Sequence, residues 1–155
     1  MNKLRRSFVK FAGGLCAMAT VGASGLLRSA AARAANWNKA GFESKAFAEA
    51  MKSLGAAGAA VSKDIVITAP EIAENGAVVP VEVTSRIPGT ESISVVAEKN
   101  PFPLVATVDL ANGSEPYTYV RIKMGGTSDV WAVVRAGGKY FTAKKEIKIT
   151  VGGCG

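Results

Sequence analysis

Residues 81–97, with the sequence VEVTSRIPGTESISVVA, decide the class of fold. Apolar and polar side chains alternate on each side of Pro88-Gly89, and a period of two is typical of a strand that buries one face. The Pro-Gly pair is a turn signal. The stretch therefore predicts two short, half-buried β-strands separated by a turn.

The same alternation recurs along the second half of the chain. Further runs occupy residues 65–68, 104–110, 120–124, 130–134 and 147–151. Turn signals divide them at Asn75-Gly76, Asn100-Pro101-Phe102-Pro103, Asn112-Gly113, Gly125-Gly126 and Gly137-Gly138. About seven or eight short strands at this spacing predict an antiparallel, immunoglobulin-like β-sandwich. Residues 129–135 carry apolar side chains on both faces of their strand, which indicates either ordinary core or a subunit interface.

One helix is expected before the strands, over residues 36–54. Its apolar residues follow a helical spacing, and Gly55 ends the pattern. These apolar residues are Phe42, Ala46, Phe47, Ala50, Met51 and Leu54. The stripe could bind a partner, but packing on the helix's own domain is the more common arrangement and is favoured here. The helix and the sandwich together form one domain, residues 35–151.

The charge of the chain is concentrated at its beginning. The 155 residues carry 19 Lys and Arg against 12 Asp and Glu, and none is His. Six of the basic residues lie in the first 34 residues, which contain no acid, so the rest of the chain has 13 basic and 12 acidic residues. This near neutrality argues against nucleic-acid binding. Without histidine, Ser-His and Cys-His nucleophile pairs are excluded.

Residues 1–34 have the order of regions of a secretory signal peptide. A basic start is followed by a mildly apolar, glycine-containing stretch and by Ala32-Arg33-Ala34, a small-x-small cleavage pattern. Arg5, Arg6, Phe8 and Lys10 match the twin-arginine export motif. We expect cleavage after Ala34 and a periplasmic protein that leaves the membrane after cleavage. A retained membrane anchor is disfavoured because the apolar stretch is shorter than the roughly 20 residues that span a bilayer.

Cleavage would remove Cys16 and leave Cys154 as the one cysteine, within Gly152-Gly153-Cys154-Gly155. The glycines predict a flexible arm, and three residues beyond Val151 reach roughly 10 Å when extended. No Lys, Arg or His adjoins the thiol, so it is interpreted as an attachment point rather than a self-sufficient nucleophile. The alternative interpretations of this cysteine are a disordered chain end, an interchain disulfide, and a metal site shared with a partner. A thiol-disulfide oxidoreductase is disfavoured, since there is no Cys-x-x-Cys pair.

The Gly-Gly-Cys-Gly ending, together with three further stretches, resembles the SoxY family of the periplasmic thiosulfate-oxidising system. These stretches are residues 69–81 (APEIAENGAVVPV), residues 100–103 (NPFP) and residues 127–154. The resemblance also includes the twin-arginine signal and the N-terminal helix. It therefore extends over essentially the whole chain.

The resemblance implies that Cys154 is a covalent attachment site for sulfur intermediates and that Gly152, Gly153 and Gly155 form its arm. It implies no catalytic residue, bound cofactor or metal in this chain. The implied partners are a SoxZ-like sandwich subunit, a haem enzyme that joins thiosulfate to the cysteine, a sulfate-releasing hydrolase, and a sulfane dehydrogenase or another acceptor of the remaining sulfur. The alternative is an exported immunoglobulin-like binding or structural module whose terminal cysteine forms an interchain disulfide.

Overall fold

The computed structural model describes residues 37–111 and 113–150, which form two short helices and nine strands. The helices are α2 (Lys39–Glu43) and α3 (Phe47–Ser53). The strands are β1 (Ala60–Val61), β2 (Ile65–Thr68), β3 (Ile72–Ala73), β4 (Val79–Ser85), β5 (Thr90–Ala97), β6 (Leu104–Asp109), β7 (Tyr117–Ile122), β8 (Ser128–Ala136) and β9 (Lys139–Ile149).

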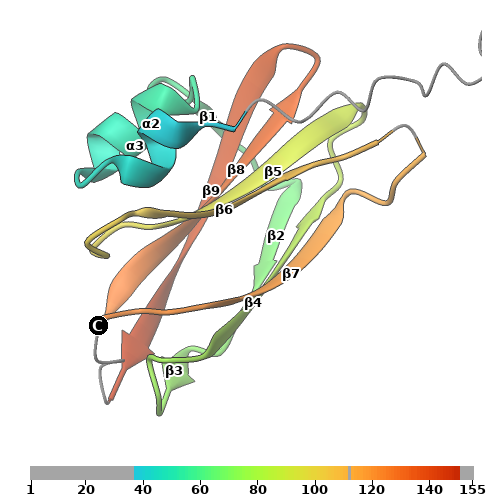
Figure 1. Ribbon diagram of the computed structural model, residues 1–155. Coiled ribbons are helices and arrows are strands. Elements are labelled where there is room, and N and C mark those ends of the chain that lie inside the picture. Colours follow the sequence, from blue (N-terminus) through green and yellow to red (C-terminus); the bar gives the residue numbers. More distant parts are fainter. Residues whose placement is uncertain (1–36, 112, 151–155) are drawn as a thin grey trace, which may run out of the picture. The chain divides into compact units, whose positions relative to one another are not determined.

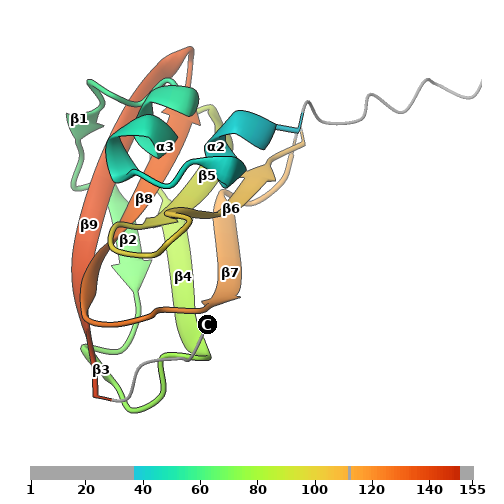
Figure 2. The same ribbon diagram turned by 60° about the vertical axis from the view of Figure 1, so that its left-hand side comes forward.

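The strands form two sheets that face each other. The larger sheet has the order β1-β9-β8-β5-β6, with β3 also paired to β9, and the smaller sheet has the order β2-β4-β7. The helices lie over the outer face of the larger sheet, and the smaller sheet lies on its opposite face (Figures 1 and 2). All neighbours pair antiparallel except β1 and β3, which are parallel to β9. The predicted β-sandwich is confirmed.

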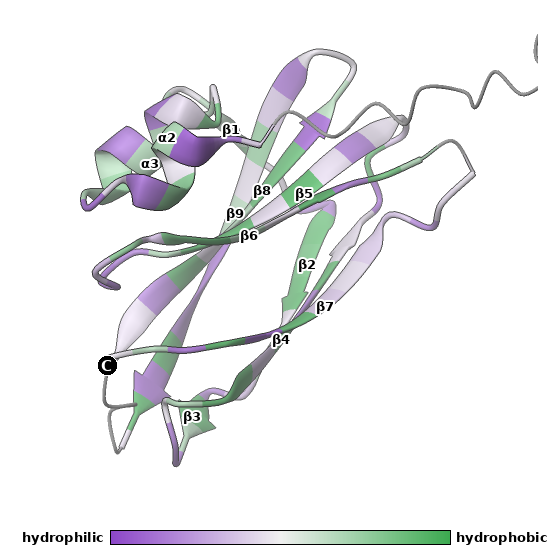
Figure 3. Ribbon diagram, in the orientation of Figure 1, coloured by the Kyte–Doolittle hydropathy of each residue, from purple (hydrophilic) through white to green (hydrophobic). Residues whose placement is uncertain are grey.

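The main core lies between the two sheets. On β4, Val79, Val81 and Val83 are buried and alternate with more exposed residues, as the period of two predicts. Ile93 on β5 and Ile147 on β9 meet them from the larger sheet and are fully buried. The hydrophobic colouring of β2 and parts of β4 and β5 follows this core (Figure 3). Burying each such side chain stabilises the fold by about 1.5–3 kcal/mol.

A second core lies between the larger sheet and helix α3. Ala50 and Met51 of α3 pack with Val96 and Val133 of the sheet, and the rings of Phe47 and Trp131 lie 5.3 Å apart. Strand β8 is therefore buried on both faces, with Val133 towards the helix and Val134 towards the smaller sheet. The apolar residues at positions 129–135 are core, and the favoured packing of the helix on its own domain is confirmed.

The expectation of one helix over residues 36–54 is wrong, because α2 and α3 are separate helices. The chain is extended at Ser44 and Ala46, and Ser44 Oγ donates to the carbonyl of Ala40 at 2.7 Å. A serine side chain that bonds the backbone in this way competes with helix continuation. The apolar spacing hid the break. The helices also pack closely: a Cβ on Gly41 would lie 2.5 Å from Ser53 Oγ and 2.9 Å from Leu104.

The last strand is longer than expected, because β9 begins at Lys139 rather than near residue 147. Gly137 and Gly138 connect it to β8 and have φ values of 55° and 71°. Two left-handed residues make a tight hairpin turn whose twist matches the strands. Residues 139–146 were missed because Lys and Glu interrupt their apolar alternation. Val151 was predicted as the end of this strand, but it lies outside the described residues. The two-residue strands β1 and β3 were not expected.

Candidate functional site

The residues predicted to act lie outside the part of the chain that the structure describes. These are Cys154 and the arm residues Gly152, Gly153 and Gly155, as well as the export residues Arg5, Arg6, Phe8, Lys10 and Ala34. The structure does describe Thr150, four residues before Cys154. It therefore shows where the arm is attached to the sandwich.

On one side, the end of β9 is held by the segment around β3. Ile72 pairs with Lys148, and Ala73 pairs with Ile149, in parallel register. The amide of Lys148 donates to the carbonyl of Glu71 at 2.9 Å, and the amide of Thr150 donates to the carbonyl of Ala73 at 3.2 Å. Thr150 Oγ1 adds a hydrogen bond to the carbonyl of Glu74 at 3.1 Å. These contacts continue the sheet up to the last described residue.

On the other side, Thr127 of the β7–β8 connection accepts a hydrogen bond at Oγ1 from the amide of Ile149, at 3.0 Å. We call Thr127, residues 71–74 and residues 148–150 the root clasp. Because both flanks of β9 are bonded here, the clasp fixes the position and direction of the chain at Thr150. Its hydrogen bonds join segments that are 22 and 76 residues apart.

A second set of hydrogen bonds braces the loops next to the root clasp. Asn100 Nδ2 donates to the carbonyl of Lys123 at 2.6 Å, and Asn100 Oδ1 accepts from the amide of Gly125 at 3.3 Å. The amide of Met124 donates to the carbonyl of Gly76 at 2.7 Å. The stretches on which the sequence resemblance depends, residues 69–81, 100–103 and the beginning of 127–154, are thus brought together at one end of the domain.

Sequence reasoning had given no role to Asn100, Thr127 or Thr150. The signal that could have found them is their position, because each lies within one of the stretches that carry the resemblance. Polar residues there, outside the alternating apolar runs, are suited to bonding the backbone of neighbouring loops.

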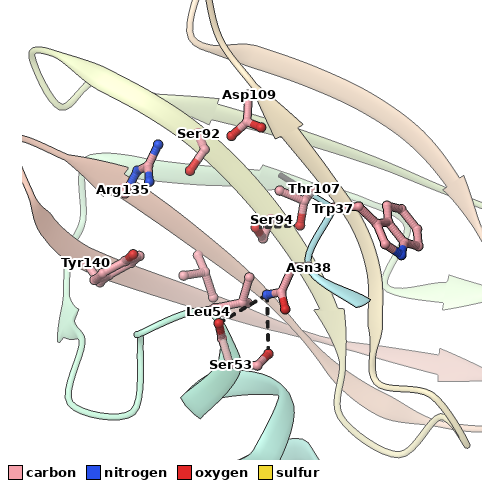
Figure 4. A pocket seen from close by; sticks show the side chains of 11 residues that line it. Trp37, Asn38, Ser53, Leu54, Ser92, Ser94, Thr107, Asp109, Arg135 and Tyr140 are labelled. Atoms are coloured by element: carbon pink, nitrogen blue, oxygen red, sulfur yellow. Dashed lines mark hydrogen bonds between the residues drawn. The ribbon is translucent and has the colours of Figure 1, made fainter. Parts of the chain in front are cut away.

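A polar cleft of about 350 Å³ lies between the helices and the other end of the larger sheet (Figure 4). Ser92, Ser94, Thr107, Asp109 and Arg135 are among the residues that line it. The hydroxyls of Ser94 and Thr107 bond each other at 2.9 Å. The cleft offers polar groups to a ligand, without an activated nucleophile.

The guanidinium of Arg135 forms an ion pair by distance, with Nε 3.1 Å from Glu91 Oε2, but the buried Nε makes no hydrogen bond of suitable geometry to any described residue. Among the residues that the structure describes, no group of three or more His, Cys, Asp or Glu side chains could hold a metal ion. The same residues contain no helix long and apolar enough to cross a membrane.

Lys144 and its neighbours form a surface cluster on the larger sheet. Lys144 Nζ donates to Asp129 Oδ2 at 2.6 Å and lies 5.2 Å from the centre of the Trp131 ring. The hydrogen bond and the charge of Asp129 raise the pKa of Lys144. Trp131 Nε1 donates to Glu98 at 2.8 Å. A lysine held protonated in this way is neither a base nor a nucleophile at neutral pH. The contacts of Lys144 and Glu98 with Trp131 instead support the packing of that ring.

The fold and the root clasp define a class of protein: a β-sandwich that presents its C-terminal segment from one braced end, as a carrier or binding domain does. A family model described as "Sulfur oxidation protein SoxY" matches residues 50–154, which include the clasp and Cys154. The chain belongs to the SoxY family of sulfur oxidation proteins.

A solved structure supports the same assignment. The sulfur carrier protein SoxY from Chlorobium limicola f thiosulfatophilum is 38% identical to this chain, with a TM-score of 0.62, and the match covers 69% of this chain and 94% of that one. An engineered protein that is 16% identical, with a TM-score of 0.39, matches 56% of this chain and 20% of its own length and carries no weight. No curated protein matches the chain significantly.

Proposed function

We propose that this protein is a covalent carrier of sulfur intermediates, with Cys154 as the attachment site and without catalytic activity of its own. The observation that carries the proposal is the reach of the family match, which continues past the root clasp to residue 154. Gly152, Gly153 and Gly155 surround the cysteine with residues that place the fewest limits on the backbone. The clasp supports the proposal because it gives such an arm a fixed origin at Thr150.

The proposed loading step forms a bond between the Cys154 sulfur and the outer sulfur of thiosulfate. The thiol loses its proton and the two sulfurs together lose two electrons, which a haem-containing partner enzyme accepts. Water then attacks the sulfonate sulfur in a hydrolase, which releases sulfate and leaves a persulfide on Cys154. No redox change is needed for that hydrolysis. A sulfane dehydrogenase then accepts the electrons that are released as water supplies oxygen to the outer sulfur, or another acceptor takes that sulfur from the persulfide. The polar cleft and the Lys144 cluster take no part.

The proposal includes a periplasmic location after twin-arginine export, with cleavage after Ala34, and a complex with a SoxZ-like sandwich subunit. Twin-arginine signals direct folded proteins across the membrane. A partner without its own signal would therefore travel out bound to this chain. Comparing the mass of the mature protein with that of the full chain tests the cleavage, and the proteins that co-purify with it test the complex.

Mass spectrometry of the intact protein, isolated from cells given thiosulfate, tests the carrier role. Cys154 should carry a thiosulfonate or additional sulfur atoms, and Cys154→Ser should abolish both these adducts and thiosulfate oxidation without changing the fold. The matched control is Cys16→Ser, which should leave the adducts unchanged because the signal peptide is removed. Finding Cys154 only as a free thiol or as an interchain disulfide would favour the binding or structural module instead.

A further inference from the structure

The root clasp limits how far a partner enzyme can remain from the sandwich. Thr150 is the last residue shown to be bonded on the domain, and Cys154 is four residues further along the chain. Four extended residues span about 14 Å at most. An enzyme whose reacting atoms lie at the bottom of a pocket several ångströms deep must therefore bring the rim of that pocket against the end of the domain.

Three exposed apolar side chains lie at this end: Ile72, Val78 and, on the loop of residues 100–103, Phe102. Ile72 is 58% exposed and pairs with Lys148, so it is part of the root clasp. Val78 is 55% exposed and follows Gly76, whose carbonyl binds the β7–β8 connection. Their neighbours Ala73 and Val79 are buried, which fixes the backbone that presents them. We call Ile72 and Val78 the collar. Figure 1 shows β3 beside the end of β9, with the start of β4 close by.

We infer that the collar is the docking surface for the enzyme that joins thiosulfate to Cys154, and that this enzyme presents an apolar rim around a narrow entrance for the arm. This inference rests on the proposed function. It assigns a binding role to two side chains that the packing of the domain leaves in solvent. Contact at the collar would hold the enzyme at the one place from which the short arm can enter its pocket.

In the test, the wild-type gene in its own host is replaced by a gene that encodes one of two variants. One is Val78→Glu, and the other is the double variant that combines Ile72→Thr with Val78→Thr. Threonine keeps the branched shape that β-strands favour, so the double variant protects against a failure to fold. After growth with thiosulfate, the fraction of chains with sulfur on Cys154 is measured by intact mass spectrometry. We expect it to fall about tenfold, the effect of losing a central apolar contact in an interface.

Two measurements separate docking from other effects. The rate at which N-ethylmaleimide modifies reduced Cys154 should be unchanged, because a small reagent needs no docking surface. The matched control is Val61→Glu, since Val61 is 81% exposed and its partner Thr142 lies seven residues before Ile149, about 23 Å along β9. That variant should load normally.

Collar variants that load like the wild type would overturn the inference. So would a loss of loading accompanied by loss of the co-purifying sandwich subunit, because the collar would then belong to that subunit interface. If the wild-type protein itself carries no sulfur on Cys154, the proposed function fails and the inference fails with it. Reduced loading with unchanged maleimide reactivity and an intact complex supports it.

Discussion

The two ends of strand β9 lie at opposite ends of the domain and are built differently (Figure 1). At its beginning, β9 turns back onto β8 through Gly137 and Gly138, and β1 pairs with Phe141 and Thr142 on its other flank. At its end, β9 is bonded to Ala73 and Glu74 on one flank and to Thr127 on the other. The first end closes the sheet, and the second fixes a point from which the chain continues.

This difference indicates how a small β-sandwich can serve as a carrier. Movement at the hairpin end leaves the start of the arm in place, because the arm begins at the other end of β9. The clasped end determines where a short arm starts, and with only three residues between Thr150 and Cys154 any movement of the root moves the thiol. We therefore expect changes at the hairpin end to alter stability, and changes at the clasped end to alter loading.

Shortening the arm should have the largest effect. Deleting Gly152 and Gly153 removes about 7 Å of reach. Because misplacement by even about 1 Å can cost a reaction about a hundredfold, we expect enzymatic sulfur loading of the cysteine to be essentially lost. Mass spectrometry of protein from thiosulfate-grown cells measures the loading, and urea unfolding should show unchanged stability. Normal loading of the deletion variant would mean that the length of the arm does not limit access.

The hairpin end should give the largest effect on stability. Replacing Gly137 and Gly138 with Ala places two side chains in the left-handed region, at about 1–2 kcal/mol per residue. We expect the free energy of unfolding in urea to fall by about 2–4 kcal/mol, while the folded protein still loads sulfur on Cys154. Gly125→Ala is the matched control: a Cβ meets nothing within 4 Å at any of the three glycines, but Gly125 is not in the left-handed region. Equal stability of the two variants would show that the turn tolerates other residues.

The same contrast explains what could be predicted from the sequence. The hairpin turn and most strands were predicted, because Gly137-Gly138 and the alternation around Val81 are local signals. The root clasp was not, because Thr127 and Thr150 find their partners 22 and 76 residues away, and no local pattern indicates such pairs. The break at Ser44 was missed for another reason: the apolar spacing of Phe42, Ala46 and Phe47 continues across it. The role of Cys154 rests on the resemblance and on its glycine neighbours, and it stays a prediction because the residue lies outside the described part of the chain.

A smaller and more local effect is expected at the clasp. Thr127→Val keeps the shape of the side chain and removes the acceptor of the Ile149 amide, a hydrogen bond worth about 1 kcal/mol. Hydrogen exchange at that amide should accelerate about fivefold. The amide of Ala143, in the antiparallel ladder with β8, is the internal control and should not change. Unchanged exchange at Ile149 would mean that β3 alone holds the root.

The middle of β9 provides a reference between its two ends and should show the smallest effect. Lys144 is exposed and paired with Asp129, which raises the pKa of Lys144 above its ordinary value of 10.5. A raised lysine pKa means that the ion pair stabilises the fold below pH 10.5, and that this contribution disappears as the pH rises through the raised value. Surface pairs contribute little, so Lys144→Met should lower the urea midpoint slightly at pH 7.

The difference in urea midpoint between wild type and Lys144→Met should then vanish at a pH well above 10.5, where residue 144 is uncharged in both proteins. Lys39→Met is the control, because Lys39 Nζ and Glu43 Oε1 are 3.7 Å apart and both side chains are largely exposed. Neither variant should alter sulfur loading, because neither Lys39 nor Lys144 belongs to the root clasp, the collar or the arm. A loading defect in Lys144→Met would extend the docking surface along β9, beyond the collar.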